Sequence, residues 1–325
     1  MDKPVFSIIA PIYNELENLP LLYARVHDEM EKTGEPWELI MVDDGSKDGS
    51  TDVIRKLASS DTRVRPVIFA RNFGHQIAVT AGLDYSRGDA VIIIDADLQD
   101  PPEVMGELIA KWREGYEVVY AVRTEREGES RFKTTTAAAF YRFIDRITDI
   151  RIPLDTGDFR LMDRKVVDIM NSMRERNRFL RGMSAWTGFK QIGVEYKRQA
   201  RHAGESKYPL KKMLKLAMNA VTGFSMWPLE LATRVGIGLM ALDFIGLIVV
   251  IILSTAAKMD FHGLATLGII IVFLAGLILA FMGVLGEYIG RVYDEAKGRP
   301  LYIVAEGPQE PFNRTRLDLP PDRKA

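Results

Sequence analysis

The sequence has no cysteine, only four histidines and almost no net charge. Without cysteine the chain can form neither disulfides nor thiolate metal sites, and it has no cysteine nucleophile. The histidines are scattered at positions 27, 75, 202 and 262, which is not the spacing of a zinc site. Lys and Arg together number 43 and Asp and Glu 44, so the basic field typical of nucleic-acid binding is missing. We therefore expect chemistry based on oxygen and nitrogen groups, and no nucleic acid among the partners.

A secretory signal is also missing from the N-terminus, where the apolar run that follows Pro4 is short and is broken at Pro11. Long apolar runs occur instead late in the chain, at residues 231–257 and 264–286. Each run is longer than the roughly 20 residues that cross a bilayer. The pattern predicts a two-helix transmembrane hairpin within residues 231–290.

Basic residues flank this hairpin on both sides. They are Arg234, Arg291, Lys297 and Arg299. The connection between the two runs carries only Lys258 as a Lys or Arg residue. Since positive flanks are retained in the cytoplasm, both flanks are expected there. The chain is thus predicted to be an integral protein of the cytoplasmic (inner) membrane, with two spans and with both termini and the N-terminal domain in the cytoplasm.

Short apolar segments alternate with helical segments over the first 120 residues. The strand candidates are residues 5–11, 39–43, 65–69, 90–95 and 117–122. The helix candidates between them begin near Leu16, Asp48, Gly74 and Pro102. This alternation predicts βαβ units and an α/β domain with a mostly parallel sheet, in which ligands bind beyond the carboxyl ends of the strands. Polar clusters follow the first, second and fourth strand candidates.

Residues 207–230 separate this domain from the hairpin. Between residues 208 and 224, apolar side chains share one helical face. On a second face lysines repeat every four residues, at Lys207, Lys211 and Lys215. The pattern is typical of an amphipathic helix in the membrane interface. A core helix with solvated lysines is the alternative.

The C-terminal segment, residues 291–325, contains one more strand candidate at residues 299–305. This strand could pair with the edge of its own domain or with that of a neighbouring copy, and we expect a homo-oligomer. Beyond Gly307 the tail is rich in proline and charge and is predicted to be loosely ordered.

The fourth strand candidate ends in the sequence Asp95-Ala96-Asp97-Leu98-Gln99. Carboxylate and amide oxygens are the hard ligands that Mg²⁺ or Mn²⁺ prefers and shares with substrate phosphates. An Asp-x-Asp pair by itself is more often a solvated turn. Because this one follows a buried strand, we predict that Asp95, Asp97 and Gln99 bind a divalent metal ion, Mg²⁺ or Mn²⁺.

The second strand candidate ends at Asp43 and Asp44. Acidic residues in this place accept hydrogen bonds from a base or ribose in other nucleotide folds. The alternative is a turn with a helix cap, which fits Asp48 and Ser50 best. The cluster after the first strand, residues 10–15, is a turn when taken by itself.

Together these clusters resemble the family 2 glycosyltransferases of the GT-A (Rossmann-like) fold. The motifs that occur in the family's order are Pro11-x-Tyr13-Asn14-Glu15, Asp43-Asp44-Gly45-Ser46 and Asp95-x-Asp97-x-Gln99. Three further segments, 70–74, 97–102 and 204–208, make the chain look like the polyisoprenyl-phosphate glycosyltransferases. The likeness covers nearly the whole chain and is greatest to bactoprenol glucosyltransferases, with dolichol-phosphate mannose synthase-like enzymes as a related group.

The resemblance implies a role for individual residues. The nucleotide would be bound by Pro11, Tyr13, Glu15, Asp43, Asp44 and Asp95. Asp95, Asp97 and Gln99 would hold the metal against the diphosphate. Asp158, which would face the acceptor as base or orienter, and Asp97 would be the catalytic residues. Acceptor phosphate would meet Arg201, Ser206 and Lys207.

Two further groups of charged residues have more than one interpretation. Arg123, Arg131 and Lys133 could reach either phosphate, or could belong to a solvated loop. Asp243 lies near the middle of the first apolar run, where a carboxylate costs about 2.5–3.5 kcal/mol on insertion scales. It is expected to face a partner helix, in a functional or a packing role.

The predicted function is the metal-dependent transfer of a hexose from a nucleotide-sugar to a polyisoprenyl phosphate at the cytoplasmic face of the membrane. The resemblance favours UDP-glucose and undecaprenyl phosphate, in an inverting single displacement for surface-glycan or lipid modification. Mannose from GDP-mannose is the alternative. A phosphate whose second pKa is about 6 is already largely dianionic at pH 7, so a strong general base is unnecessary.

Two other classes of function are less compatible with the sequence. A processive polysaccharide synthase would need more spans and a Gln-x-x-Arg-Trp motif, where this chain has Arg178-Phe179-Leu180-Arg181-Gly182. A membrane protein that only senses a nucleotide-sugar could have lost the metal pair, but Asp95 and Asp97 are both present. The predicted domains are a cytosolic GT-A domain at 1–206, a juxtamembrane region at 207–230, the hairpin at 231–290 and a C-terminal strand and tail at 291–325.

Overall fold

The structure, a computed structural model, describes residues 3–124, 156–197, 227–256 and 263–308. These residues belong to two compact units. The first unit contains the N-terminal residues up to 197 together with residues 300–308, and the second contains residues 227–299. The predicted interfacial helix and the C-terminal tail lie largely outside the described residues, so both stay predictions.

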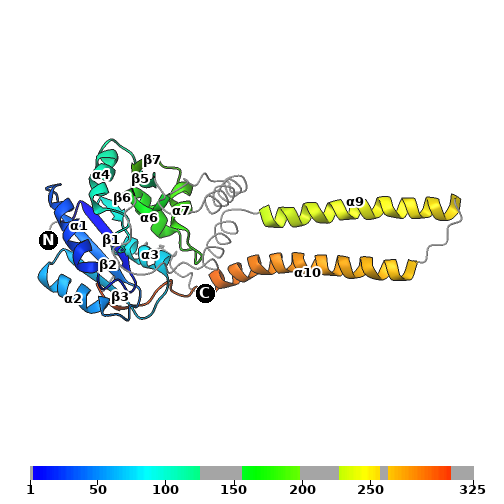
Figure 1. Ribbon diagram of the computed structural model, residues 1–325, viewed down its shortest axis with the longest axis horizontal. Helices are drawn as coiled ribbons and strands as arrows, with labels where there is room; N and C mark the ends of the chain where they lie inside the picture. Colours follow the sequence, from blue (N-terminus) through cyan, green and yellow to red (C-terminus); the bar gives the residue numbers. More distant parts are fainter. Residues whose placement is uncertain (1–2, 125–155, 198–226, 257–262, 309–325) are drawn as a thin grey trace, which may run out of the picture. The chain divides into compact units, whose positions relative to one another are not determined.

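The first unit is built on an eight-stranded sheet with the order β7-β5-β6-β4-β1-β2-β3-β8 (Figure 1). The strands are β1 (Phe6–Ile12), β2 (Trp37–Asp43), β3 (Val64–Phe69), β4 (Ala90–Ile93), β5 (Val118–Arg123), β6 (Thr156–Asp163), β7 (Gln191–Tyr196) and β8 (Val304–Glu306). β4, β1, β2 and β3 are parallel neighbours, as are β5 and β7. The predicted mostly parallel sheet is confirmed, and β6 lies antiparallel between β4 and β5.

The helices described in this unit are α1 (Leu19–Glu31), α2 (Ser50–Ser60), α3 (His75–Tyr85), the 3₁₀ turn η1 (Pro102–Val104), α4 (Met105–Arg113), α6 (Arg164–Ser172) and α7 (Leu180–Trp186). The helical segments predicted near Leu16, Asp48, Gly74 and Pro102 begin within three residues of those positions, whereas α6 and α7 were not predicted. The first helix begins at Leu19 rather than near Leu16, with Pro20 in its first turn, where a missing N–H costs nothing.

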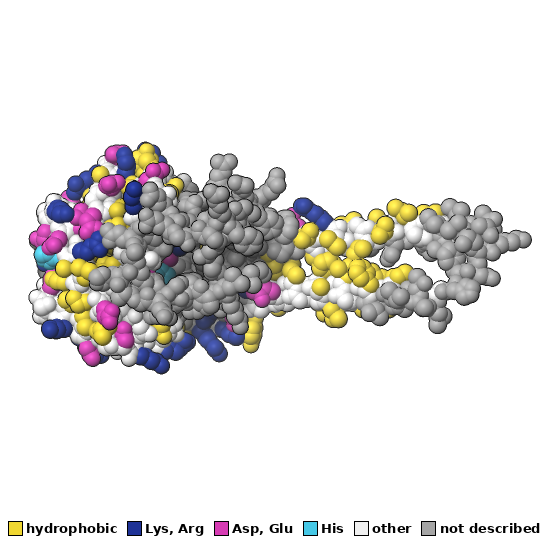
Figure 2. All heavy atoms as spheres, in the orientation of Figure 1, with side chains coloured by type: hydrophobic (Ala, Val, Ile, Leu, Met, Phe, Trp, Pro, Cys, Tyr) yellow, Lys and Arg dark blue, Asp and Glu magenta, His cyan; other side chains and the backbone are white. Residues whose placement is uncertain are grey.

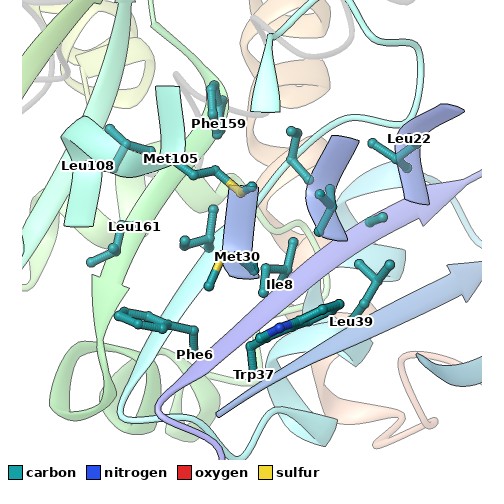
Figure 3. Close-up of a cluster of buried hydrophobic side chains, with 14 of the residues drawn as sticks. Phe6, Ile8, Leu22, Met30, Trp37, Leu39, Met105, Leu108, Phe159 and Leu161 are labelled. Carbon is teal, nitrogen blue, oxygen red and sulfur yellow. The ribbon is translucent and has the colours of Figure 1, made fainter. Parts of the chain in front are cut away.

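The two faces of the sheet are covered by different helices. Successive residues of a strand point to opposite faces, so Phe6, Ile8 and Ala10 of β1 share one face. They join a buried cluster with Leu22 of α1 and Met105 of α4 (Figure 3). The other face of β1 meets α3.

The approach of α3 to β1 is very close. A Cβ added at Gly82 would lie 2.2 Å from a side-chain carbon of Ile9 and would clash with it. Glycine has no Cβ, so it allows the helix to come this close to the strand. Asn171 of α6 donates a hydrogen bond to the carbonyl of Leu83 at 3.2 Å. The helix that begins at His75 is therefore held tightly against the sheet, which fixes where its first residues lie.

The second unit consists of α9 (Trp227–Ala256) and α10 (Gly263–Ala296), which have 30 and 34 residues and contact each other. Hydrophobic side chains are exposed on both helices (Figure 2). Among the described residues, one stretch is long and apolar enough to cross a membrane, Phe273–Ala296 of α10, and none of it is buried. Two helices thus exist where the hairpin was predicted, but a second span and the transmembrane hairpin are not confirmed. Asp243 lies within α9, and its side chain is outside what the structure describes.

Candidate active site

The three polar clusters of the sequence lie at the carboxyl ends of adjacent strands, β4, β1 and β2. In a parallel sheet this is the edge where ligands bind. Since β6 runs antiparallel to β4, with Arg160 opposite Ile93, its first residues reach the same edge. The fold therefore brings Asp158 to the edge that carries Asp95 and Asp43.

The loops after β1 and β2 are interlocked by Asn14. This residue adopts a left-handed conformation (φ +54°), which asparagine tolerates better than most residues. Its backbone N–H donates to the hydroxyl of Ser46 at 2.9 Å, and its side-chain oxygen accepts from the N–H of Lys47 at 2.8 Å. The N–H of Glu15 donates to Ser50 at 3.1 Å. Tyr13 stays accessible between these fixed residues.

Asp43 and Asp44, both predicted to bind the nucleotide, are buried and accept hydrogen bonds within the protein. Asp43 holds its own loop, accepting from the N–H of Ser46 at 2.9 Å and from the hydroxyl of Thr51. Burial raises the pKa of Asp44, although bonds from two backbone N–H groups oppose that rise. A carboxylate offers about four lone pairs, so Asp43 retains capacity for a further donor.

Asp44 fastens the loop of residues 70–74. Its carboxylate accepts from the N–H of Phe73 at 2.6 Å and from the N–H of Gly74 at 2.9 Å. Its backbone oxygen accepts from the side chain of Asn72 at 3.1 Å. This loop leads directly into α3, so Asp44 sets the position at which His75 begins the helix.

Asp95 follows β4, and one of its carboxylate oxygens faces His75. Its Oδ1 is buried and accepts no hydrogen bond within the described part of the chain; it lies 3.6 Å from Nε2 of His75. Burial raises the pKa of Asp95 to about 6. The positive charge of His75 lowers this pKa, whereas the negative charges of Asp100 and Asp158 raise it further.

The turn after Asp95 is strained. Leu98 has φ +59°, a left-handed conformation that is unfavourable for a bulky residue. Asp97 holds the turn, since its Oδ1 accepts from the N–H of Gln99 at 3.1 Å. Strain of this kind is concentrated at functional sites.

The predicted metal site can be tested against these residues. No group of three or more His, Asp or Glu side chains among the described residues could hold a metal by itself. Mg²⁺, however, is usually bound through one or two carboxylates and completes its shell with water and substrate phosphates. A carboxylate with a buried oxygen that accepts no hydrogen bond from the described residues fits such a site, and the assignment to Asp95, Asp97 and Gln99 stays a prediction.

Asp158 is the most tightly held carboxylate of the site. It is 6 % exposed; its Oδ1 accepts from Nε of Arg181 at 2.8 Å, and its Oδ2 accepts from the amide of Gln76 at 2.8 Å. Nε2 of His75 lies 3.0 Å from the same Oδ2. Burial alone would raise its pKa, but Arg181 and His75 outweigh burial and hold the pKa of Asp158 well below its usual value. Asp158 is therefore ionised at any physiological pH.

His75 joins the two sides of the site through one ring nitrogen, which faces Asp95 and Asp158. Burial would lower the pKa of His75, but these two carboxylates raise it to about 9. The imidazole is therefore mainly protonated at neutral pH and bridges two negative charges.

Arg123, predicted either to reach a phosphate or to belong to a solvated loop, contacts the acidic motif in this structure. Its NH2 lies 3.6 Å from Oδ2 of Asp100, and its Nε donates to the hydroxyl of Tyr196 at 3.1 Å. Tyr196 in turn donates to Asp100. Arg123 thus balances the charge of a buried carboxylate. Five other predicted residues lie outside the described residues: Arg131, Lys133, Arg201, Ser206 and Lys207.

Four further residues belong to this edge although no sequence pattern predicted a role for them: His75, Gln76, Arg181 and Tyr196. Arg181 belongs to Arg178-Phe179-Leu180-Arg181-Gly182, the segment that stands where a processive synthase has its Gln-x-x-Arg-Trp motif. The alignment of this segment with the synthase motif could have revealed Arg181, because Arg181 stands at the position of the motif's arginine. His75 and Gln76 follow directly on the family-like segment 70–74, which marks their neighbourhood as part of the site.

The comparison with known proteins agrees with this architecture. Residues 7–169 match the family model "Glycosyl transferase family 2". The bactoprenol glucosyl transferase of Shigella phage SfV is 41 % identical over 304 residues, which are 94 % of this chain and 99 % of that protein. The uncharacterized glycosyltransferase YkcC of Bacillus subtilis is 54 % identical over 299 residues, 92 % of this chain and 93 % of that one.

Among solved structures, glucosyl-3-phosphoglycerate synthase from Mycobacterium tuberculosis, in complex with Mn²⁺, UDP-glucose and phosphoglyceric acid, is 18 % identical with a TM-score of 0.44. The match covers 67 % of this chain and 78 % of that one. The protein is a glycosyltransferase with the GT-A fold. It belongs to glycosyltransferase family 2.

Gly45 tests how far the site depends on the contact between the loop after β2 and residues 70–74. A Cβ at Gly45 would lie 2.7 Å from backbone atoms of Arg71 and Asn72, and φ is +73°. Gly49 also has positive φ (+97°), but a Cβ there meets only Leu16, at 3.8 Å. Gly49→Ala should lower the free energy of unfolding by about 1–2 kcal/mol, the cost of the left-handed conformation.

Gly45→Ala should cost about 1–3 kcal/mol more than Gly49→Ala, because its Cβ also displaces the loop backbone. Denaturant unfolding of the purified chain measures both costs. Hydrogen exchange at Phe73 and Gly74 should accelerate only in Gly45→Ala. Equal behaviour of the two variants would mean that the close contact is unimportant.

Proposed function

We propose that the chain transfers glucose from UDP-glucose to a polyisoprenyl phosphate, such as undecaprenyl phosphate, at the cytoplasmic face of the membrane. The relatives named for bactoprenol glucosyl transfer match along nearly their whole length, which supports a lipid phosphate acceptor. The exposed apolar surface of α9 and α10 suits an enzyme whose acceptor lies in a bilayer.

One observation carries the proposal: His75 contacts Asp95 and Asp158 with a single nitrogen, at 3.6 and 3.0 Å. Asp95 belongs to the predicted donor side and Asp158 to the predicted acceptor side. A displacement requires the two substrates to meet at one point, in reacting geometry. That a single imidazole nitrogen contacts both carboxylates supports such a meeting point here.

On the donor side we assign the nucleotide to Pro11, Tyr13, Glu15, Asp43 and Asp44. The interlocked loops hold these residues before any ligand binds, which reduces the entropy lost on binding. Asp95 and Asp97, with Gln99, would hold Mg²⁺ or Mn²⁺; when bound, the cation supplies Lewis acidity for the diphosphate.

On the acceptor side we assign Asp158 to orientation rather than to proton removal. A carboxylate whose pKa lies far below neutral is a weak base, and Asp158 is occupied by Arg181, Gln76 and His75. A dianionic phosphate oxygen attacks without losing a proton. Asp158 therefore keeps the cations of Arg181 and His75 at fixed positions beside the reacting centre. The resemblance assigns the acceptor phosphate itself to Arg201, Ser206 and Lys207.

The reaction is tested by incubating the purified full-length chain with undecaprenyl phosphate, Mn²⁺ and radiolabelled nucleotide-sugars. UDP-glucose should give labelled lipid, and label from GDP-mannose instead would change the proposed donor. Asp97→Ala should reduce product at least about a hundredfold, because charge on the leaving group is no longer stabilised. Asp52→Ala, which removes an exposed carboxylate of α2, is the matched control. If Asp97→Ala keeps full activity, the metal assignment is wrong.

Asp158→Asn tests the orienting role. The amide cannot balance Arg181 and His75, so kcat should fall about a hundredfold or more while the KM for the donor changes little. The residual activity should follow the pH dependence of the unchanged protein. A residual rate that instead rises with pH, as hydroxide replaces a lost base, would identify Asp158 as a general base. Asp168→Asn on the surface of α6 is the control.

We further infer that α9 and α10 both cross the membrane, with both termini in the cytoplasm. Because the chain has no cysteine, single cysteines can be introduced as Lys3→Cys, Asp260→Cys and Ala325→Cys. In intact cells a membrane-impermeant maleimide should label only Asp260→Cys. In permeabilised cells it should label all three variants. Labelling of Ala325→Cys without Asp260→Cys would indicate a single span.

A further inference from the structure

Tyr302 contacts both ends of the segment that carries His75. Its ring stacks on Phe69 with centroids 5.2 Å apart and planes at 15°. Its hydroxyl donates to Oδ2 of Asp84 at 2.7 Å. Phe69 ends β3, and Asp84 lies in the last turn of α3. The loop and helix between them, residues 70–83, are thus bracketed by one side chain.

From Phe69 the contacts continue into the active site. Phe69 packs edge-to-face on Phe73, with centroids 5.5 Å apart and planes at 86°. Phe73 is the residue whose N–H is bonded by Asp44 at 2.6 Å. His75 and Gln76, the two residues that contact Asp158, begin two positions after Phe73. An aromatic series therefore connects Tyr302 with the residues that hold the acceptor-side carboxylate.

Tyr302 is itself fixed by its surroundings. The next residue, Ile303, accepts from the N–H of Ala70 at 3.0 Å, and β8 then pairs with β3. Asp84 is 2 % exposed and also accepts from Arg174 at 2.8 Å. Burial and the charge of Asp84 raise the pKa of Tyr302, so its hydroxyl remains a donor. Both contacts of Tyr302, with Phe69 and with Asp84, are therefore made to residues that the structure holds in place.

We propose that Tyr302 is a positioning residue of the active site, which holds the segment from Phe69 to Asp84 so that His75 and Gln76 meet Asp158. Tyr302 belongs to the segment that directly follows α10 in the chain. The chain that leaves the long helix thereby determines the geometry of the catalytic edge. The activity arm of the test rests on the proposed sugar transfer, and the exchange arm does not.

The test compares three variants of the full-length chain. Tyr302→Leu removes the ring stack and the hydroxyl. Tyr302→Phe keeps the stack and removes only the bond to Asp84. Glu306→Gln is the control. It weakens the exposed ion pair between Glu306, which lies four residues after Tyr302, and Arg55 of α2, 2.7 Å long, and it leaves the aromatic series intact.

In the activity arm, Tyr302→Leu should lower kcat about ten- to a hundredfold with little change in donor KM, since small displacements of positioned groups have effects of this size. Tyr302→Phe should restore most of kcat, and Glu306→Gln should match the unchanged protein. A loss in Tyr302→Leu that appears only in thermal stability, or an equal loss in Glu306→Gln, overturns the proposal.

In the exchange arm, hydrogen exchange is measured on the protein without substrates. Peptides that cover residues 70–78 should exchange faster in Tyr302→Leu, whereas peptides from β6 should not change. Unchanged exchange at 70–78, or equal acceleration throughout the domain, overturns the positioning role. If the unchanged protein forms no labelled lipid with any donor, the proposed function fails while this arm still decides the role of Tyr302.

Discussion

The bonds of Asp158 connect three elements that are distant in sequence: α3, β6 and α7. A buried charge that loses its partner costs about 3–5 kcal/mol, so Arg181, Gln76 and His75 are held where Asp158 needs them. The rest of the site depends on this constraint. The antiparallel direction of β6 brings the carboxylate to the ligand edge, and the close packing of Gly82 on β1 brings the start of α3 to the carboxylate.

The carboxylates at this edge have different tasks. Asp43 and Asp44 shape their loops, and Asp100 is balanced by Arg123 and Tyr196. Asp95 and Asp100 each have a buried oxygen that accepts no hydrogen bond within the described residues, and each of these oxygens lies 3.6 Å from a cationic side chain, His75 or Arg123. Most of the negative charge is thus used to build a rigid frame, which is the arrangement expected where a site must not reorganise during a reaction.

Much of the fold could be predicted because apolar runs and turn residues mark parallel strands that are buried on both faces. The β6 strand could not, since Asp158 and Arg160 are buried charges inside it and interrupt the apolar pattern on which prediction relies. The polar clusters after β1, β2 and β4 were predictable because parallel strands must present them at one edge.

The partners of Asp158 were not predictable from the sequence alone. Arg181 follows Asp158 by 23 residues, and His75 precedes it by 83, so their meeting depends on the strand order. A single histidine has no spacing that reveals its partners. Asp44 was predicted as a nucleotide ligand, but its bonds to Phe73 and Gly74 could be seen only once the loop after β3 had a position.

The edge strand β8 has a consequence for biosynthesis. It pairs with β3, yet its residues are translated only after α9 and α10, more than two hundred residues behind the strand they cover. Until then β3 presents an open edge, which is a template for association with other chains. Because domains form as the chain emerges, the catalytic sheet stays incomplete while the long helices are made. Completion of the enzyme is therefore tied to the synthesis of its apolar part, so a chain that stops early lacks a finished sheet.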